Sequence, residues 1–220
     1  MALVAARNEE LRLSATLTSL ALALPGVRVW VADDASTDAT AAIAQRMGAR
    51  VATSPSHVGK GATMTLAARA ALEEGAGGST VVLCDADLGA SAGHLAELVA
   101  VVERREADLA VGAFARRGGG GVGVTVGFAR LALARACGTW MRAPLSGQRA
   151  LRAGALQELL PFAEGFGMEL AMVLDARRAG MRVAERVLPL EHREHGRDVA
   201  GFAHRGRQLA DIVRAYARRR

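Results

Sequence analysis

The sequence predicts an α/β protein with a mostly parallel central sheet and helices on both faces. In residues 1–90, short apolar runs alternate with helical patterns, as repeated βαβ units require. Hydrophobic residues make up 51% of the chain but aromatic residues only 4%, so the core must be aliphatic, which suits buried parallel strands. At 220 residues, the chain has the length of one domain.

The first half divides into four strands and the helices that connect them. Strands are expected at residues 3–6, 27–32, 50–53 and 80–84, with helices at 9–24, 36–47 and 58–74. The run at 80–84 is apolar throughout, which indicates a central strand.

The second half is less regular. Expected helices lie at 91–105, 124–141, 168–179 and 199–218, and expected strands at 109–113, 148–152 and 182–190. Arg116 and Arg117 precede four glycines, a segment that reads as a loop able to close over a ligand.

Polar segments follow three of the expected strands directly. They are Arg7-Asn8-Glu9, Asp33-Asp34 and Asp85-Ala86-Asp87. Ligands of parallel sheets bind at the carboxyl ends of the strands, so these segments are expected to meet at one edge. Asp85 and Asp87 would point the same way from an extended segment and could share one Mg²⁺ or Mn²⁺ ion, which in turn could bridge two phosphates.

Charge and composition narrow the class of partner. The net charge of +6 favours an acidic partner, and no nucleic-acid-binding module is visible, so a phosphorylated substrate or an anionic membrane surface ranks ahead of nucleic acid. Cys84 and Cys137 lack metal-ligand spacing and are expected to be reduced. With no signal peptide and no apolar run of about 18 residues, a cytoplasmic location is expected.

Four segments in series resemble the family 2 glycosyltransferases. These are Ala5-Ala6-Arg7-Asn8-Glu9-Glu10, Val31-Ala32-Asp33-Asp34-Ala35-Ser36-Thr37-Asp38, Gly59-Lys60-Gly61 and Leu83-Cys84-Asp85-Ala86-Asp87-Leu88. The resemblance implies a single GT-A type, Rossmann-like domain over residues 1–220. Residues 1–90 would bind the nucleotide, 91–198 the acceptor, and 199–220 would form a basic amphipathic helix.

The same resemblance implies residue roles on the donor side. A nucleotide diphosphate sugar would be bound by Ala5, Arg7, Asn8, Glu9, Asp34, Lys60, Asp85 and Ala86. Asp87 would bind the Mg²⁺ or Mn²⁺ ion and act in catalysis, with Asp85 as a second ligand. The sole lysine of the chain, Lys60, and its sole asparagine, Asn8, both fall in these segments. The alternative is structural: Asp33, Asp34 and Asp38 could make an Asx turn and a helix cap.

On the acceptor side, Ser146, Gly147 and Arg149 resemble a segment of the polyprenyl-phosphate branch, and Arg117 is the basic residue of the glycine loop. The resemblance also extends to sugar transferases that act on phosphoglycerate. Glu169 falls where inverting family members carry an acidic residue, and it would accept the proton of the acceptor hydroxyl or orient the acceptor. A helix-dipole role is the alternative for Glu169.

The segment Glu191–Asp198 resembles a late segment of related enzymes. It implies that Arg193 contacts the diphosphate and that Arg197 contacts the diphosphate or an anionic acceptor, because arginine binds phosphate oxygens in pairs. It also implies a third metal ligand in His192.

The implied activity is metal-dependent transfer of a sugar from a UDP- or GDP-linked donor to a lipid phosphate or a small phosphorylated acid. The alternatives are a sugar-phosphate nucleotidyltransferase and a non-catalytic nucleotide-sugar or membrane-binding protein. The C-terminal helix would either contact a membrane peripherally or pack on the domain. The sugar, the acceptor, the anomeric outcome and the oligomeric state, a homodimer included, are left open.

Overall fold

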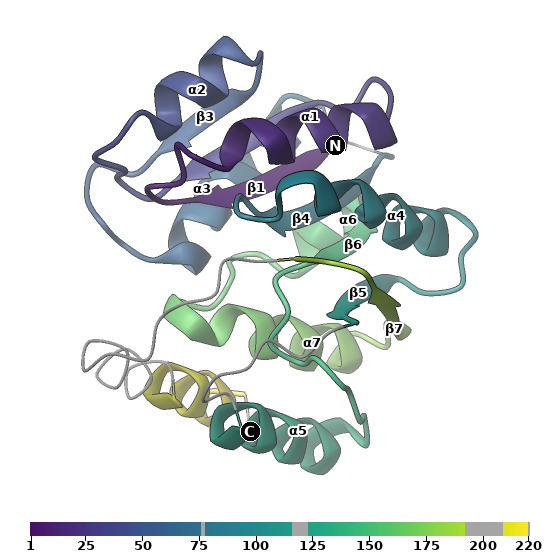
Figure 1. The fold of residues 1–220 in the computed structure, drawn as a ribbon. Helices are drawn as coiled ribbons and strands as arrows, with labels where there is room; N and C mark the ends of the chain where they lie inside the picture. The colour runs from purple at the N-terminus through teal and green to yellow at the C-terminus, as the bar shows by residue number, and fades with distance from the viewer. Residues whose placement is uncertain (76–77, 116–122, 192–208, 220) are drawn as a thin grey trace.

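A computed structural model describes residues 1–75, 78–115, 123–191 and 209–219 (Figure 1). Its centre is a seven-stranded sheet with the order β3-β2-β1-β4-β6-β5-β7. The strands are β1 (Ala2–Ala6), β2 (Val29–Asp33), β3 (Arg50–Thr53), β4 (Thr80–Asp85), β5 (Leu109–Phe114), β6 (Arg149–Arg152) and β7 (Val183–Leu188). All neighbouring pairs are parallel except those of β6, which runs antiparallel to β4 and to β5. The predicted fold class is confirmed.

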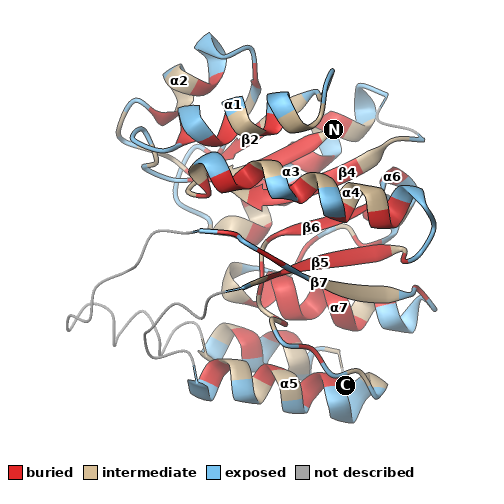
Figure 2. Cartoon of the chain, turned by 45° about the vertical axis from the view of Figure 1, so that its right-hand side comes forward, coloured by how far each residue is buried: buried red, intermediate tan, exposed pale blue. Residues whose placement is uncertain are grey.

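Helices cover both faces of the sheet, and a separate apolar core fills each side. One core contains buried residues of α3 (Lys60–Glu73), α5 (Gly123–Cys137), α6 (Ala153–Glu158) and α7 (Met168–Arg178). The other contains residues of α1 (Leu13–Ala23), α2 (Thr40–Arg46) and α4 (Ala96–Glu103). In Figure 2, the buried positions concentrate on the strands and on the inward sides of these helices. The cores are mostly Ala, Leu and Val, as the low aromatic content predicts.

Several elements differ from the predicted ranges. α1 starts at Leu13 rather than residue 9, and α2 at Thr40 rather than residue 36. In both places, side chains bind the backbone of the preceding turn, as when Asp38 Oδ1 accepts the Thr40 amide at 2.9 Å. A 3₁₀ helix (Gly89–Leu95) precedes α4. The short α6 was not predicted, because six residues are too few to show a helical period.

The end of the chain packs on the domain. A helix over residues 209–217 buries Ile212 and Ala215 completely or nearly so, and the Tyr216 ring meets Phe128 of α5 edge to face at 5.9 Å. This part of its apolar surface is therefore occupied by protein. Residues 199–208 of the predicted helix lie outside the described residues. Within the described part of the chain, none of the helices has both the length and the apolar character needed to cross a bilayer.

Candidate active site

Three strand ends place the polar segments at one edge of the sheet. In the parallel register, Ala6 lies opposite Asp33 and Ala5 lies opposite Asp85. The carboxyl ends of β1, β2 and β4 are therefore adjacent, and the turns that follow them share one side of the sheet. This brings together the three segments that the sequence predicted to meet.

A cavity of about 620 Å³ opens at this edge. It is lined by Ala5, Ala6, Arg7, Glu9, Ala32, Asp34, Lys60, Thr63, Asp85, Ala86, Asp87, Phe114, Val126, Arg142, Ala143, Leu145, Ser146, Gly147, Gln148, Phe166 and Glu169. Most of the predicted site residues that the structure describes are in this set. Two are not: Asn8 and Arg149.

Lys60 joins the two halves of the cavity. Its Nζ lies 2.6 Å from Asp85 Oδ1 at the end of β4 and 2.8 Å from Glu169 Oε1 in the first turn of α7. Burial by itself would lower the pKa of Lys60, but the two carboxylates outweigh burial and raise the pKa above its ordinary value. Lys60 is therefore a fixed positive charge between the carboxylates of Asp85 and Glu169.

Gln148, which was not among the predicted site residues, holds Asp85 from the other side. Its Nε2 donates to Asp85 Oδ2 at 2.6 Å, and its Oε1 accepts from the Asp85 backbone N–H at 3.1 Å. Both contacts arise because β6 pairs with β4, with Leu83 opposite Arg149. The only signal in the sequence was the position of Gln148 between the predicted Gly147 and Arg149.

Asp34 binds the turn that leads into α3. Its carboxylate accepts hydrogen bonds from the amides of Val58 at 2.9 Å and Gly59 at 3.0 Å, and it lies 2.7 Å from His57 Nδ1. The residue after this turn is Lys60. Asp34 lines the cavity, and it also supports the turn that presents the lysine.

Asn8 holds two of the polar turns together rather than lining the cavity. Its Oδ1 accepts the Thr37 backbone N–H at 2.8 Å, and the Asn8 backbone N–H donates to Ser36 Oγ at 2.9 Å. Asn8 has a φ of 55°, a conformation that asparagine tolerates better than most residues. These contacts explain an asparagine at this position by structure alone.

Asp87 sits on a turn held by α1. Thr16, fully buried in α1, donates from Oγ1 to the Ala86 carbonyl at 2.7 Å and accepts the Gly89 amide at 2.8 Å. Arg12 adds a contact of 3.3 Å to the Asp87 carbonyl. The threonine and the arginine were not among the predicted site residues, because their role depends on how α1 packs against this turn.

Hydrogen bonds inside the protein hold the segment of Ser146 in place. Ser146 Oγ donates to the Gly112 carbonyl at 2.6 Å, and Arg149, only 1% exposed, donates to the Ser146 and Pro144 carbonyls at 2.9 and 3.2 Å. Burial lowers the pKa of Arg149 to about 10, although Glu169 and Asp85 oppose the shift. Arg149 therefore supports the wall of the cavity from inside the protein.

The donor atoms at the edge of the sheet suit a hard divalent cation. Asp85 and Asp87 both line the cavity, and Mg²⁺ typically takes one or two carboxylates together with phosphate oxygens and water. Among the described residues, no three Asp, Glu, His or Cys side chains converge on one point. The predicted ligand His192 lies outside the described residues, as do Arg193, Arg197 and Arg117.

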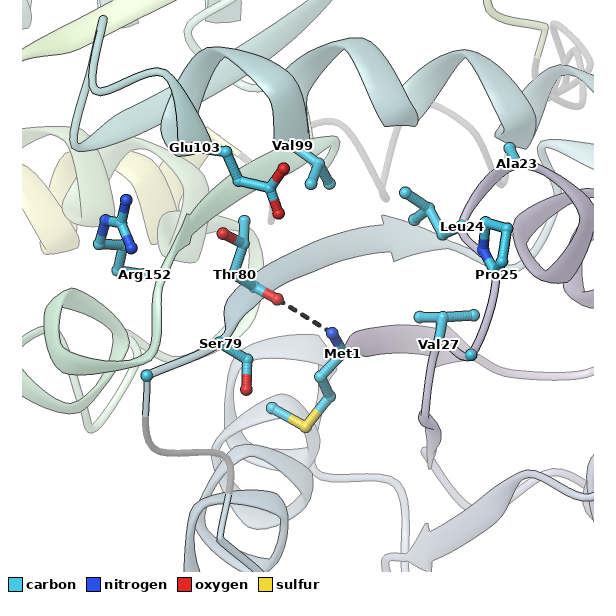
Figure 3. A pocket seen from close by; sticks show the side chains of 12 residues that line it. Met1, Ala23, Leu24, Pro25, Val27, Ser79, Thr80, Val99, Glu103 and Arg152 are labelled. Carbon is cyan, nitrogen blue, oxygen red and sulfur yellow. Dashed lines mark hydrogen bonds between the residues drawn. The ribbon is translucent and has the colours of Figure 1, made fainter.

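A second cavity, of about 420 Å³, lies at the opposite ends of the strands (Figure 3). Its lining includes Thr80 at the start of β4 and Met1, whose amino nitrogen donates to the Thr80 carbonyl at 2.9 Å. Glu103 and Arg152 add single charges. None of the clustered carboxylates reaches it, so the cavity at the carboxyl ends is the candidate active site.

Comparison with known proteins identifies a family and solved structures that are similar to this chain. The family model described as "Glycosyl transferase family 2" matches residues 2–159. A search of curated proteins found no match. Among solved structures, glucosyl-3-phosphoglycerate synthase from Mycobacterium tuberculosis in complex with phosphoglyceric acid is 27% identical, with a TM-score of 0.80 over 99% of this chain and 78% of that one.

Two further complexes of the same mycobacterial enzyme are similar. The complex with Mn²⁺, UDP and glucosyl-3-phosphoglycerate is 26% identical, with a TM-score of 0.79 over 99% of this chain and 78% of that one. The complex with Mn²⁺, UDP-glucose and phosphoglyceric acid is also 26% identical, with a TM-score of 0.76 over 98% and 79%.

Proposed function

The chain belongs to glycosyl transferase family 2, and on this premise we propose that it transfers glucose from UDP-glucose to the hydroxyl group of a small phosphorylated acid. The similarity to a glucosyl-3-phosphoglycerate synthase supports both the donor and the class of acceptor. Membership of a glycosyltransferase family also argues against a nucleotidyltransferase.

The observation that carries the proposal is the bridge made by Lys60. One lysine within 2.8 Å of Glu169 and 2.6 Å of Asp85 brings the acceptor-side carboxylate next to the segment expected to hold the diphosphate. Transfer requires the donor and the acceptor to be bound side by side, because effective molarity depends on the reacting atoms being held close together. The cavity of about 620 Å³ lies within the usual range of small-molecule sites. Parts of a nucleotide sugar and of a small acid could therefore occupy it together.

Each side chain then has a chemical task. A bond forms between the acceptor hydroxyl oxygen and the anomeric carbon, and the bond from that carbon to the β-phosphate oxygen breaks, so that UDP leaves. Glu169 accepts the hydroxyl proton. Lys60 places positive charge where the diphosphate gains negative charge, and Asp85, fixed by Gln148, orients Lys60. A cationic group in this position stabilises the leaving diphosphate.

Mg²⁺ or Mn²⁺ fits the oxygen donors of Asp85 and Asp87. When bound, the ion would supply Lewis-acid stabilisation to the diphosphate. Glu169, in the first turn of α7, is 7% exposed and lines the cavity, with its charge balanced by Lys60.

The proposal is tested by incubating the purified protein with UDP-glucose and MnCl₂ and measuring UDP release against a panel of acceptors. The panel comprises 3-phosphoglycerate, glycerol 3-phosphate, unphosphorylated glycerate and a polyprenyl phosphate. We expect release with 3-phosphoglycerate, loss of release with EDTA, and a glucosylated product by mass spectrometry. Release with the polyprenyl phosphate alone, or with no acceptor in the panel, would overturn the proposed acceptor.

Two variants separate catalysis from folding. Glu169→Gln is expected to lower kcat by about 10²–10⁴-fold while leaving UDP binding intact. The matched control is Asp108→Asn, which removes a carboxylate that pairs with Arg182 at 3.0 Å. The control should retain wild-type turnover, because Asp108 does not line the cavity.

A further inference from the structure

The outward face of α5 is apolar and exposed. Val124 is 74% exposed and Leu131 is 61% exposed. Gly127, which lies between them in the sequence, is also exposed. These residues are three or four positions apart, so they lie on one side of the helix. The opposite side, with Ala129 and Leu133, is buried in the core. In Figure 2, α5 lies at the lower edge of the molecule with exposed residues along it.

Trp140 extends this face beyond the end of the helix. It is 69% exposed and lies against the guanidinium of Arg130, 5.4 Å from that group to the ring centroid. Arg130 also donates to the Met141 carbonyl at 3.0 Å, which keeps the segment after α5 folded back along the helix. Gly127 and Ala134 are the helical neighbours of Arg130, so Trp140 adjoins the apolar stripe. We call Val124, Gly127, Leu131, Ala134 and Trp140 the α5 face.

The segment of the sequence that contains the α5 face carries charge of one sign. Residues 109–157 contain no Asp or Glu, and their charged residues are Arg116, Arg117, Arg130, Arg135, Arg142, Arg149 and Arg152. Arg135 and Arg142 are exposed, next to the α5 face. Glu185, on the neighbouring β7, accepts the amides of Arg142 and Ala143 at 2.8 and 2.6 Å, so it is already bonded to this segment.

An exposed tryptophan and aliphatic residues flanked by arginines match the chemistry of an anionic lipid surface. Tryptophan favours the interface between headgroups and acyl chains, apolar side chains enter that layer, and arginines bind lipid phosphates. A symmetric contact with a second copy would instead set Arg135 and Arg142 against the same arginines, with no acid on the face to pair with them. We propose that the α5 face docks on an anionic lipid bilayer.

Docking by this face would bring the active site close to the bilayer. Val126 of α5 and Arg142 line the candidate active site as well as adjoining the docking face. The inference does not depend on the identity of the donor or acceptor, because lipid binding is measured without substrates.

The two tryptophans of the chain allow a direct test. Trp30 lies on β2 against Arg50, and β2 is separated in the sheet from β5, the strand that precedes α5, by three strands. Trp30→Phe leaves Trp140 as the sole tryptophan reporter. With vesicles of equimolar phosphatidylglycerol and phosphatidylcholine, we expect Trp140 emission to shift to the blue and brominated lipid to quench it. With pure phosphatidylcholine, or at about 0.5 M salt, the shift should be much smaller. The Trp140→Phe protein, which reports Trp30, should show no shift.

Co-sedimentation of variants with the same vesicles locates the surface. Leu131→Glu should weaken binding about tenfold or more, since an apolar side chain is lost from the contact and a negative charge is added. The control is Leu22→Glu, because Leu22 is 78% exposed on α1, away from the proposed surface. Equal losses in both variants, no binding to anionic vesicles, or a Trp140 shift that follows protein concentration without lipid would overturn the proposal. The last result would indicate a second copy of the chain as the occupant.

Discussion

Gln148 holds Asp85 by two hydrogen bonds, donating from Nε2 to Oδ2 at 2.6 Å and accepting the backbone N–H at Oε1 at 3.1 Å. The contact joins the residue before β6 to the last residue of β4, and these two strands run antiparallel. Asp85 is thereby fixed with its other oxygen toward Lys60, at 2.6 Å. The geometry of Asp85 and Lys60 therefore depends on a residue from the second half of the chain.

The first prediction concerns this contact. Gln148→Leu keeps most of the side-chain volume but removes both hydrogen bonds to Asp85. We expect kcat to fall about 10–100-fold, the usual loss when a residue that orients a site carboxylate is removed. Gln157→Leu is the matched control, because Gln157 is exposed on α6. Steady-state UDP release gives the kcat of both variants. An unchanged kcat for Gln148→Leu would contradict the orienting role of Gln148.

The second prediction uses the charge of Lys60. The pKa of Lys60 is raised above the ordinary 10.5, so the ammonium group stays positively charged throughout the pH range in which lysines usually remain protonated. A raised folded pKa means that the stabilising interaction is complete below the unfolded pKa and is lost only as pH rises through the folded value. We therefore expect the difference in Tm between the wild type and Lys60→Met to stay constant from about pH 7 to pH 10.

A difference in Tm that shrinks between about pH 8 and pH 10 would contradict that prediction, because it would place the folded pKa of Lys60 in this range. Activity gives an independent check. Lys60→Met should lower kcat/KM about 10²–10³-fold, as expected for loss of a cation that faces developing negative charge. Arg69→Met is the control, since Arg69 lies on the exposed side of the same helix.

Much of the fold could be predicted from the sequence because its signals are local. Apolar runs separated by helical periods indicate βαβ units wherever they occur, and the strands β1 to β5 all appear within two residues of their predicted bounds. The antiparallel direction of β6 could not be predicted in this way. A four-residue strand carries no sign of its direction, which depends on its insertion between β4 and β5.

The residues of the candidate site also fall into two groups, those that local motifs predict and those that depend on contacts between distant segments. Asp85, Asp87, Lys60 and Glu169 stand in motifs, and the cavity brings them together. Gln148 and Thr16 act through contacts between residues 63 and 70 positions apart along the chain, which no local pattern records. Arg149 illustrates the reverse case. Its type and position suggested contact with an acceptor, but its side chain is buried behind the loop that lines the cavity.

The third prediction concerns Gly147, where a side chain would meet the carboxylate–lysine pair. A Cβ at this position would lie 2.8 Å from Asp85 Oδ2 and would also contact Lys60 Nζ, so Gly147→Ala must displace the pair. A displacement of about 1 Å can cost about 100-fold in rate, and we expect a loss of this order in kcat. In Gly154→Ala, the control on α6, the added methyl has no neighbour within 4 Å.

The two glycine variants should differ in stability as well as in rate. Gly154→Ala should raise stability by about 0.5–1 kcal/mol, because alanine is the better helix former, and leave kcat unchanged. Thermal unfolding and UDP release measured side by side give both values. A Gly147→Ala protein with wild-type kcat would show that the Lys60–Asp85 geometry does not limit turnover.

The last prediction concerns the turn that carries Asp87. Thr16→Val removes a buried hydroxyl that donates to the Ala86 carbonyl at 2.7 Å and accepts the Gly89 amide at 2.8 Å, leaving both backbone groups without that partner. We expect a loss of about 1–3 kcal/mol in unfolding free energy. Because the turn loosens, the Mn²⁺ concentration for half-maximal activity should rise about 10-fold or more. Thr18→Val, on the exposed side of α1, should change stability by less than about 0.5 kcal/mol. Equal metal requirements in the two variants would mean that α1 supports the fold without positioning Asp87.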